Sequence, residues 1–185
     1  ETDWSIFILL YAAGVLFSGG ILFRKYQEIK RYFRFKRKSD STIITIPNSD
    51  AAFTFLGTIF LGDKISTEAK AYILAHEEVH LKHKHGIDLF IFEILRIVFW
   101  FNPLVHIIKN CIKLNHEFLA DKAVINKGIE ASSYQQILLA FSTNVKEPQL
   151  ANAINYSSIK KRFTVMKTET SKQKRWFRSL ILLPL

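Results

Sequence analysis

Four of the six histidines lie within ten residues, in the stretch YILAHEEVHLKHKH (72–85). His76 and His80 are four residues apart, so on a helix both imidazoles project from one face. That spacing lets two neutral ring nitrogens reach one tetrahedral metal ion at about 2.0–2.1 Å. Glu77 completes the H-E-x-x-H pattern, in which the glutamate is the general base toward a metal-activated water. The stretch predicts a zinc hydrolase site with two histidine ligands and Glu77 as its catalytic residue.

The same pattern also arises by chance on a charged helix face, and the flanking residues argue against that origin. Tyr72, Ile73, Leu74 and Val79 are apolar or aromatic, which indicates a largely buried helix. A buried helix that carries charged and titratable side chains needs partners for them. We therefore favour a functional site over a solvated helix face.

A third ligand is available in LNHEFLAD (114–121), where Glu117 and Asp121 are again four residues apart. Three protein ligands with one open position are typical of a catalytic zinc site, and His76, His80 and Glu117 form such a set. Asp121 is expected to hydrogen-bond the free nitrogen of a ligating histidine and fix its tautomer. His116 is the rival third ligand, but it points about 100° away from Glu117 on the helix.

The other histidines and the cysteine have plainer interpretations. For His83 and His85 there are three interpretations: a fourth metal ligand, contacts to substrate, or solvated residues beyond the active turn. We favour the last. His106 follows Pro103 in an apolar stretch and is expected to be a structural histidine with its hydrogen bonds satisfied. The single cysteine, Cys111, forms no internal disulfide and is expected to be buried. The residue that would stabilise an oxyanion is open among Tyr72, His83, His116 and Tyr134.

Two helices must position the predicted ligands. Ser66 is a plausible N-cap for a helix over about 67–85 that ends at Gly86. A second helix is expected over about 112–126, closed by Gly128. Further helices are expected near 131–143 and 156–169, the latter with the basic KKR on its surface.

The segments between these helices are less regular. Residues 42–62 are rich in Thr, Ile and Phe and broken by proline and glycine, which predicts two or three short strands, with a hairpin among them. FTFLGTIFL (53–61) is either an edge strand that pairs with an extended substrate or an ordinary buried strand. Residues 87–110 predict an apolar helix kinked near Pro103 that is buried against the domain or dips into the membrane interface.

The distribution of charge indicates a membrane protein. Residues 4–23 are uncharged and long enough to span a bilayer as a helix. The net charge of +10 comes with 49% hydrophobic residues, and the basic clusters at 24–38 and 172–178 each adjoin an apolar run. This arrangement is typical of juxtamembrane segments on the cytoplasmic side and argues against direct nucleic-acid binding.

The chain begins with Glu1 and stops within an apolar run, so we expect it to be a piece of a longer protein. The predicted fold class is mainly α with a small β-sheet (α+β), in a peptidase domain between two transmembrane helices. The expected divisions are a transmembrane helix (1–23), a basic cytoplasmic juxtamembrane segment (24–41), a zinc metallopeptidase domain (42–175) and the start of a further transmembrane helix (176–185).

The order of these features resembles the integral-membrane zinc metallopeptidases of the BlaR/MecR sensor-transducer family. The resemblance rests on a membrane helix, a basic stretch, a short β segment, HEEVH, FWFNP, NHEFLAD and a closing apolar run. It implies a gluzincin-like fold in the bacterial plasma membrane with the site on the cytoplasmic side. It also implies zinc held by His76, His80 and Glu117, with Glu77 as base and Asp121 as the supporting acid. In the sensor members, acylation of an extracellular penicillin-binding domain activates the peptidase, and a transcriptional repressor is inactivated.

Three functions follow as hypotheses. The first is a membrane-bound zinc endopeptidase that cleaves an intracellular protein, with a transcriptional repressor as candidate, in signal transduction. The second is a membrane quality-control protease of the HtpX type. The third is a non-catalytic, zinc-containing membrane transducer or binding module. The expected partners are a protein substrate and membrane lipid, without direct nucleic-acid contact, and a homodimer stays open.

Overall fold

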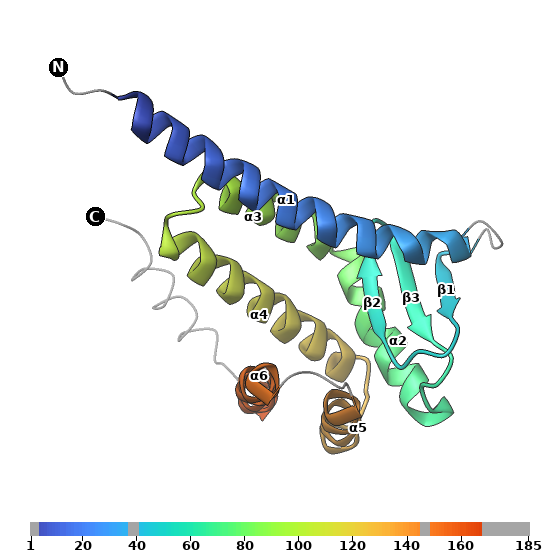
Figure 1. Ribbon diagram of the computed structural model, residues 1–185. Helices are drawn as coiled ribbons and strands as arrows, with labels where there is room; N and C mark the ends of the chain where they lie inside the picture. Colours follow the sequence, from blue (N-terminus) through green and yellow to red (C-terminus); the bar gives the residue numbers. More distant parts are fainter. Residues whose placement is uncertain (1–3, 37–40, 145–148, 168–185) are drawn as a thin grey trace.

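The computed structural model describes residues 4–36, 41–144 and 149–167. Figure 1 shows α1 along one side of the molecule, with α3 beside its first half and the sheet beside its second half. The predicted membrane segment at 176–185 and the basic cluster at 172–178 lie outside the described residues. The elements in chain order are α1 (Ser5–Lys36), β1 (Ile43–Ile46), β2 (Ala52–Phe55), β3 (Thr58–Gly62), α2 (Thr67–Lys82), α3 (His85–Val98), α4 (Pro103–Asn126), α5 (Ala131–Asn144) and α6 (Gln149–Lys167).

The architecture is mainly helical with one small mixed sheet, as the sequence predicts. The strand order is β1-β3-β2, with β3 parallel to β1 and antiparallel to β2. Leu56 and Gly57 join β2 to β3 and both have positive φ, 43° and 75°, the backbone twist that suits a two-residue hairpin. The predicted hairpin is therefore confirmed. The stretch 53–61 divides between an edge strand, β2, and the buried central strand, β3.

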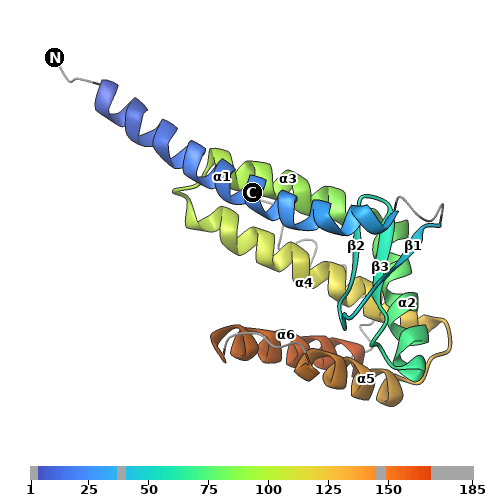
Figure 2. The same cartoon turned by 45° about the vertical axis from the view of Figure 1, so that its right-hand side comes forward.

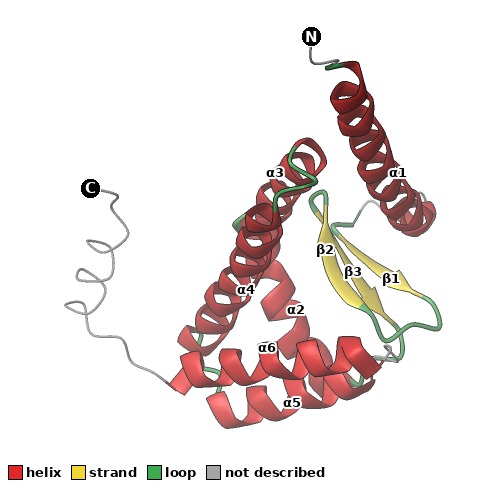
Figure 3. Ribbon diagram, turned by 60° about the vertical axis from the view of Figure 1, so that its left-hand side comes forward, coloured by secondary structure: helices red, strands yellow, loops and turns green. Residues whose placement is uncertain are grey.

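The sheet is held between α1 and α2. Ile44, Ile46 and Phe60 form a buried cluster that packs against Tyr32 and Phe33 of α1. α2 contacts β2 and β3, and Figure 3 shows it on the side of the sheet away from α1. The sheet thus fixes α2, the helix that carries His76 and His80, relative to the long N-terminal helix.

The predicted start of α2 is confirmed and its predicted end is wrong. The Ser66 hydroxyl accepts a hydrogen bond from the Ala69 amide at 3.3 Å, as an N-cap does. The helix ends at Lys82, and Lys84 adopts a left-handed conformation with φ 55°. Gly86 lies inside α3 instead of terminating α2. The turn at Lys84, which no glycine or proline announces, redirects the chain so that His85 returns toward the site.

The apolar stretch 87–110 forms parts of two helices that make an antiparallel hairpin. α3 ends at Val98, and α4 begins at Pro103, whose missing N–H costs nothing at a first helical position. The Asn102 side chain caps α4 by accepting from the Leu104 amide at 2.9 Å. The predicted interruption at Pro103 is confirmed, but the predicted helix start at 112 is wrong. α4 runs unbroken to Asn126, so it links the hairpin to the site.

The last two helices pack against the ends of α2 and α4. Val124, Tyr134 and Leu138 form a second buried cluster, joined by Phe163 and Met166 of α6. α6 begins at Gln149, earlier than the sequence predicts. Figure 2 shows α5 and α6 lying together on the side of the molecule away from α1. This pair closes the face of α4 that carries Glu117 and Asp121.

Among the described residues, one helix is long and apolar enough to cross a membrane. This span covers Ser5–Phe33 with a mean hydropathy of 2.3, and little of it is buried. α1 continues without a break to Lys36, so much of the predicted basic juxtamembrane segment is the same helix as the predicted span. A second span within 176–185 stays a prediction.

Candidate metal centre

Three side chains from two helices converge on one point. His76 and His80 come from α2 and Glu117 from α4, and one ligand atom of each lies within 4.8 Å of the others. The two histidine Nε2 atoms are 3.0 Å apart, and His76 Nε2 is 3.2 Å from Glu117 Oε2. His80 Nε2 is 3.8 Å from Glu117 Oε1. The structure brings together the three residues that the sequence predicts as ligands.

These distances fit a tetrahedral metal ion. Ligand atoms at about 2.0–2.1 Å from such an ion lie about 3.3–3.4 Å from one another, close to the observed spacings. Two neutral nitrogens and one carboxylate also form a donor set that zinc accepts in hydrolases. The residues present therefore fit a divalent ion without a change of backbone.

His76 is held from behind by a tyrosine and an aspartate. Its Nδ1 lies 2.8 Å from the Tyr134 hydroxyl and 3.3 Å from Asp121 Oδ1. The Tyr134 hydroxyl donates to the same Asp121 oxygen at 2.9 Å. Both partners are fully buried, so the ring is oriented with Nε2 toward His80 and Glu117. Asp121 lies where the sequence predicts a supporting acid, whereas Tyr134, an oxyanion candidate, lies on the Nδ1 side of His76.

Arg162 of α6 joins both acidic residues. Its guanidinium donates to Asp121 Oδ2 and Oδ1 at 2.8 and 2.6 Å and to Glu117 Oε2 at 2.9 Å. The sequence places the basic KKR on a helix surface, which holds for Lys160 and Lys161 but is wrong for Arg162. No local pattern separates this arginine from its lysine neighbours. Its role follows only from α6 packing across α4.

A second row of side chains supports His80. The His80 and His85 Nδ1 atoms are 2.8 Å apart, and the His85 ring stacks on His116 with centroids 4.0 Å apart. His116 Nε2 is 3.1 Å from Asp88 Oδ2. The expectation that His85 is solvated is wrong, because only 4% of it is exposed. His116, the rival ligand, belongs to this row and not to the group of three.

Glu77 is tied to the edge of the sheet. Its Oε2 accepts from the Thr54 hydroxyl at 2.7 Å, and its backbone carbonyl accepts from the same hydroxyl at 3.1 Å. Burial raises the pKa of Glu77, which brings this carboxyl closer to the pH at which a general base works best. Thr54 thus links the predicted catalytic base to β2.

The two ligand histidines have opposite electrostatic surroundings. Burial alone lowers the pKa of His76, but its hydrogen bonds with Asp121 and Glu117 outweigh burial and raise the pKa to about 9. Burial and the neighbouring His76 lower the pKa of His80 to about 4. Burial opposes ionisation of Glu117, yet its hydrogen bond with His76 and the charge of Arg162 hold its pKa well below the usual range. His76 therefore holds a proton more readily than His80.

The remaining candidates lie away from the group of three. His83 is exposed, as expected. The expectations for His106 and Cys111 are wrong, because both are exposed on α4. Tyr72 packs against the cluster of Val124, Tyr134 and Leu138. Both expectations assumed burial at positions that lie on the exposed face of α4.

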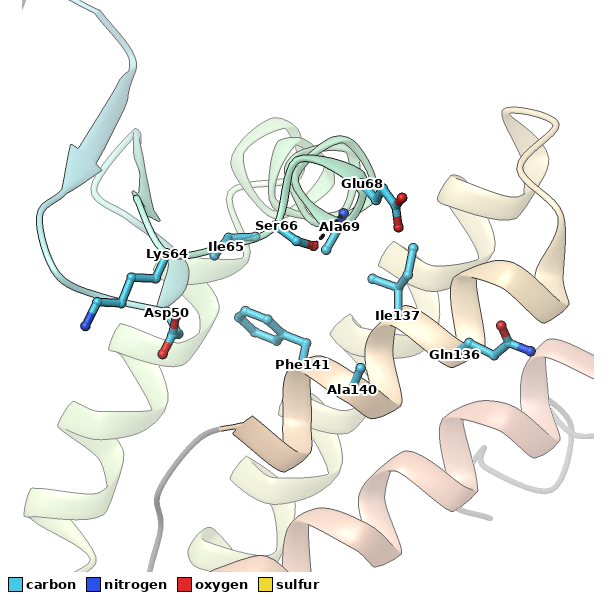
Figure 4. A pocket seen from close by; sticks show the side chains of 10 residues that line it. All are labelled: Asp50, Lys64, Ile65, Ser66, Glu68, Ala69, Gln136, Ile137, Ala140 and Phe141. Atoms are coloured by element: carbon cyan, nitrogen blue, oxygen red, sulfur yellow. Dashed lines mark hydrogen bonds between the residues drawn. The ribbon is translucent and has the colours of Figure 1, made fainter.

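A surface hollow lies between the start of α2 and one face of α5. Figure 4 shows Lys64 and Glu68 on one side of it and Ile137 and Phe141 on the other. None of the predicted ligands or their hydrogen-bond partners lines this hollow. It is therefore separate from the candidate metal centre.

The comparisons with known proteins agree with this geometry. The model of the BlaR1 peptidase M56 family matches residues 57–166, more than half of the chain. The chain therefore belongs to this family of metallopeptidases, and the resemblance drawn from the motifs is confirmed. The regulatory protein BlaR1 of Staphylococcus aureus is 44% identical over 55 residues, a match that covers 30% of this chain and 9% of that relative. The matched stretch is thus a small part of the relative's length.

Proposed function

We propose that this protein is a membrane-bound zinc endopeptidase that cleaves an intracellular protein in a signalling pathway. The observation that carries the proposal is the convergence of His76, His80 and Glu117, with the carboxyl of Glu77 near enough to feel the charges of His76 and Glu117. Membership of a peptidase family and the apolar helix α1 support it. The Staphylococcus aureus relative is a regulatory protein, which supports a regulatory substrate, for which a transcriptional repressor is the candidate.

In this proposal each side chain has a defined role. His76, His80 and Glu117 hold zinc, which when bound polarises the substrate carbonyl and acidifies water. Glu77 accepts a proton at its carboxylate and passes it to the leaving amine. Tyr134 and Asp121 orient His76 through its Nδ1 atom. Arg162 neutralises the buried Asp121 and the half-buried Glu117, which would otherwise repel each other.

The free edge of β2 is the proposed substrate-binding strand. Among the described residues β2 pairs only with β3, so its other edge has unpaired backbone groups. Thr54 in this strand contacts Glu77, which places the free edge beside the proposed base. An extended peptide that adds to β2 by backbone hydrogen bonds would bring its scissile carbonyl near the metal. We further propose that this face lies on the cytoplasmic side of a bacterial plasma membrane, in a chain that crosses it more than once.

Metal analysis tests the ligand set. We expect about one zinc per purified chain, lost in Glu117→Ala and kept in His116→Ala, because only Glu117 belongs to the group of three. A thermal melt of both variants separates loss of metal from loss of fold. A wild-type chain that stays folded but takes up no zinc after supplementation would overturn the zinc assignment.

Activity tests the role of Glu77. The purified chain in detergent is incubated with a library of unstructured peptides, and products are read by mass spectrometry. We expect Glu77→Gln to keep its zinc and lose about 10²- to 10⁴-fold in rate, as is typical for a general base. Glu78→Gln, at the exposed neighbouring position, is the matched control. A zinc-loaded wild-type chain whose products match those of Glu77→Gln in amount would favour the non-catalytic transducer instead.

A further inference from the structure

The end of the α3–α4 hairpin has its apolar residues outside and its charges inside. We call residues 94–108 the hairpin tip. Its exposed large apolar side chains are Ile94, Val98, Phe99, Trp100, Phe101, Leu104, Ile107 and Ile108. Glu93 and Arg96, in contrast, are mostly buried and pair with each other at 2.7 Å. A water-soluble helix pair has the opposite arrangement, and contiguous apolar surface of this kind marks an interaction site.

The hairpin tip packs against the apolar part of α1. The Tyr11 hydroxyl donates to the Val98 carbonyl at 3.0 Å, and the Tyr11 ring meets Phe101 edge-on at 6.4 Å. Gly14 faces the Trp100 ring so closely that a Cβ there would overlap it. Gly14 precedes Arg24, the first basic residue of α1, by ten positions, or about 15 Å at about 1.5 Å per residue. If α1 crosses a bilayer, this contact lies about half-way through a hydrocarbon core of about 30 Å.

A cluster of charges connects the three helices at the expected level of the membrane surface. Glu93 of α3 contacts Lys109 of α4 and lies 3.9 Å from Lys25 of α1. Lys25 follows the uncharged run of α1 directly after Arg24. Basic side chains at this level suit the phosphate region of a membrane. The cluster therefore separates the domain from the apolar tip.

Several backbone polar groups where the tip turns have hydrogen-bond partners, which hydrocarbon surroundings require. The Phe99 amide donates to the Leu95 carbonyl at 2.8 Å, and the Asn102 amide to the Phe99 carbonyl at 2.9 Å. The Asn102 side chain caps the start of α4, and Tyr11 of α1 satisfies the Val98 carbonyl. His106 is the exposed ionisable side chain of the tip.

We propose that the hairpin tip is a re-entrant segment, inserted into lipid beside α1 from the side of the metal centre. The occupant of its apolar surface is the acyl-chain region of the bilayer. The inference rests on α1 crossing the membrane and is independent of the peptidase chemistry. Because α4 continues from the tip to Glu117, the metal centre is held close to the membrane surface. One consequence rests on the proposed function: substrates would be cleaved at bonds near the membrane.

Depth-dependent fluorescence quenching tests the insertion. In a Cys111→Ser background, an environment-sensitive fluorophore is attached to Phe101→Cys, and the chain is reconstituted into phosphatidylcholine–phosphatidylglycerol vesicles. The lipids carry a nitroxide near either the headgroup or the middle of the acyl chain. Leu9→Cys on α1 is the control inside the membrane. Leu56→Cys, an equally exposed apolar position on the sheet, is the control outside it.

Insertion predicts a greater loss of fluorescence at position 101 with the mid-chain nitroxide than with the headgroup nitroxide, as at position 9. Position 56 should respond to an aqueous quencher only. Quenching of position 101 by the aqueous quencher would overturn the proposal. A label at position 101 that neither the aqueous quencher nor the lipid nitroxides reach would also overturn the proposal, if spin labels on two chains are then a short distance apart. That result would mean that a second copy of the chain covers the tip. Failure of position 9 to respond to lipid nitroxides would remove the premise that α1 crosses the membrane.

Discussion

The two halves of α4 have opposite surroundings. In the second half, Asp121 is buried, Glu117 is half-buried, and Arg162 neutralises both. In the first half, Lys109 is also paired inside the structure, with Glu93, but the exposed large side chains that precede it are mostly apolar. Buried charge is costly unless it is paired, so both halves pair their charges. What differs is the outer surface, which suggests that one helix joins a catalytic domain to lipid.

The largest effect should follow from breaking the charge pairing in the catalytic half. Arg162→Ala leaves the buried Asp121 and the half-buried Glu117 without their cation, and a buried charge without its partner typically costs about 3–5 kcal/mol of unfolding free energy. Lys161→Ala, at an exposed neighbouring position, should change it by about 0.5 kcal/mol or less. Chemical denaturation in detergent measures both. Equal stability of the two variants would show that the Arg162 contacts contribute little.

The next largest effect should be the change in zinc affinity with pH. His76 has a folded pKa of about 9 against an ordinary value of 6.5, so its proton must leave before metal binds. Apparent zinc affinity should rise about tenfold per pH unit between these values. The stability of the metal-free chain should change in the opposite direction and fall as pH rises. The stability from protonated His76 is fully present below pH 6.5 and is lost as pH rises through about 9.

Calorimetry in buffers of different ionisation enthalpy measures this proton directly. We expect about one proton released per zinc near pH 7, because His80 has a pKa of about 4 and is already neutral. A release of none would contradict a protonated His76. Melting curves of the metal-free chain at the two ends of the pH range provide the independent check.

A smaller effect on zinc affinity should follow from removing a hydrogen-bond partner of His76 while keeping His76 itself. Tyr134→Phe removes the hydroxyl that lies 2.8 Å from His76 Nδ1 and keeps the aromatic packing. Loss of such an orienting partner typically weakens metal affinity about 10- to 100-fold. Tyr72→Phe, which alters a tyrosine of the same hydrophobic cluster, is the control. Competition with a zinc chelator gives both affinities, and equal values would assign His76 orientation to Asp121 alone.

The smallest change in stability should follow from a substitution at the contact between α1 and the hairpin tip, which includes the first half of α4. Gly14→Ala places a methyl group against the Trp100 ring, and overpacking of this kind costs about 1–3 kcal/mol. Gly19→Ala meets no neighbouring atom, so alanine's better helix propensity should make it neutral or stabilising. Thermal melts of both variants in detergent measure the difference. A stabilised Gly14→Ala would mean that the tip does not pack against α1 as described.

The residues of the metal centre were predictable where the pattern is local. His76 and His80 are one helical turn apart, so any helix over this stretch places them together. Glu117 and Asp121 follow the same rule on α4. The Ser66 cap and the interruption at Pro103 also depend on neighbouring residues alone. These features need only the helical repeat and the chemistry of individual side chains.

Only the tertiary structure decided the remaining partners. Arg162 reaches Asp121 from 41 positions away and Tyr134 reaches His76 from 58, because α5 and α6 pack across α4. His85 is buried because Lys84 takes a left-handed conformation that no glycine or proline signals. Cys111 and His106 are exposed because the first half of α4 lies outside the domain core. The amino-acid sequence alone determined which side chains are capable of binding a metal. Packing between distant segments determined which groups neutralise and orient them, since such contacts leave no periodic pattern in the chain.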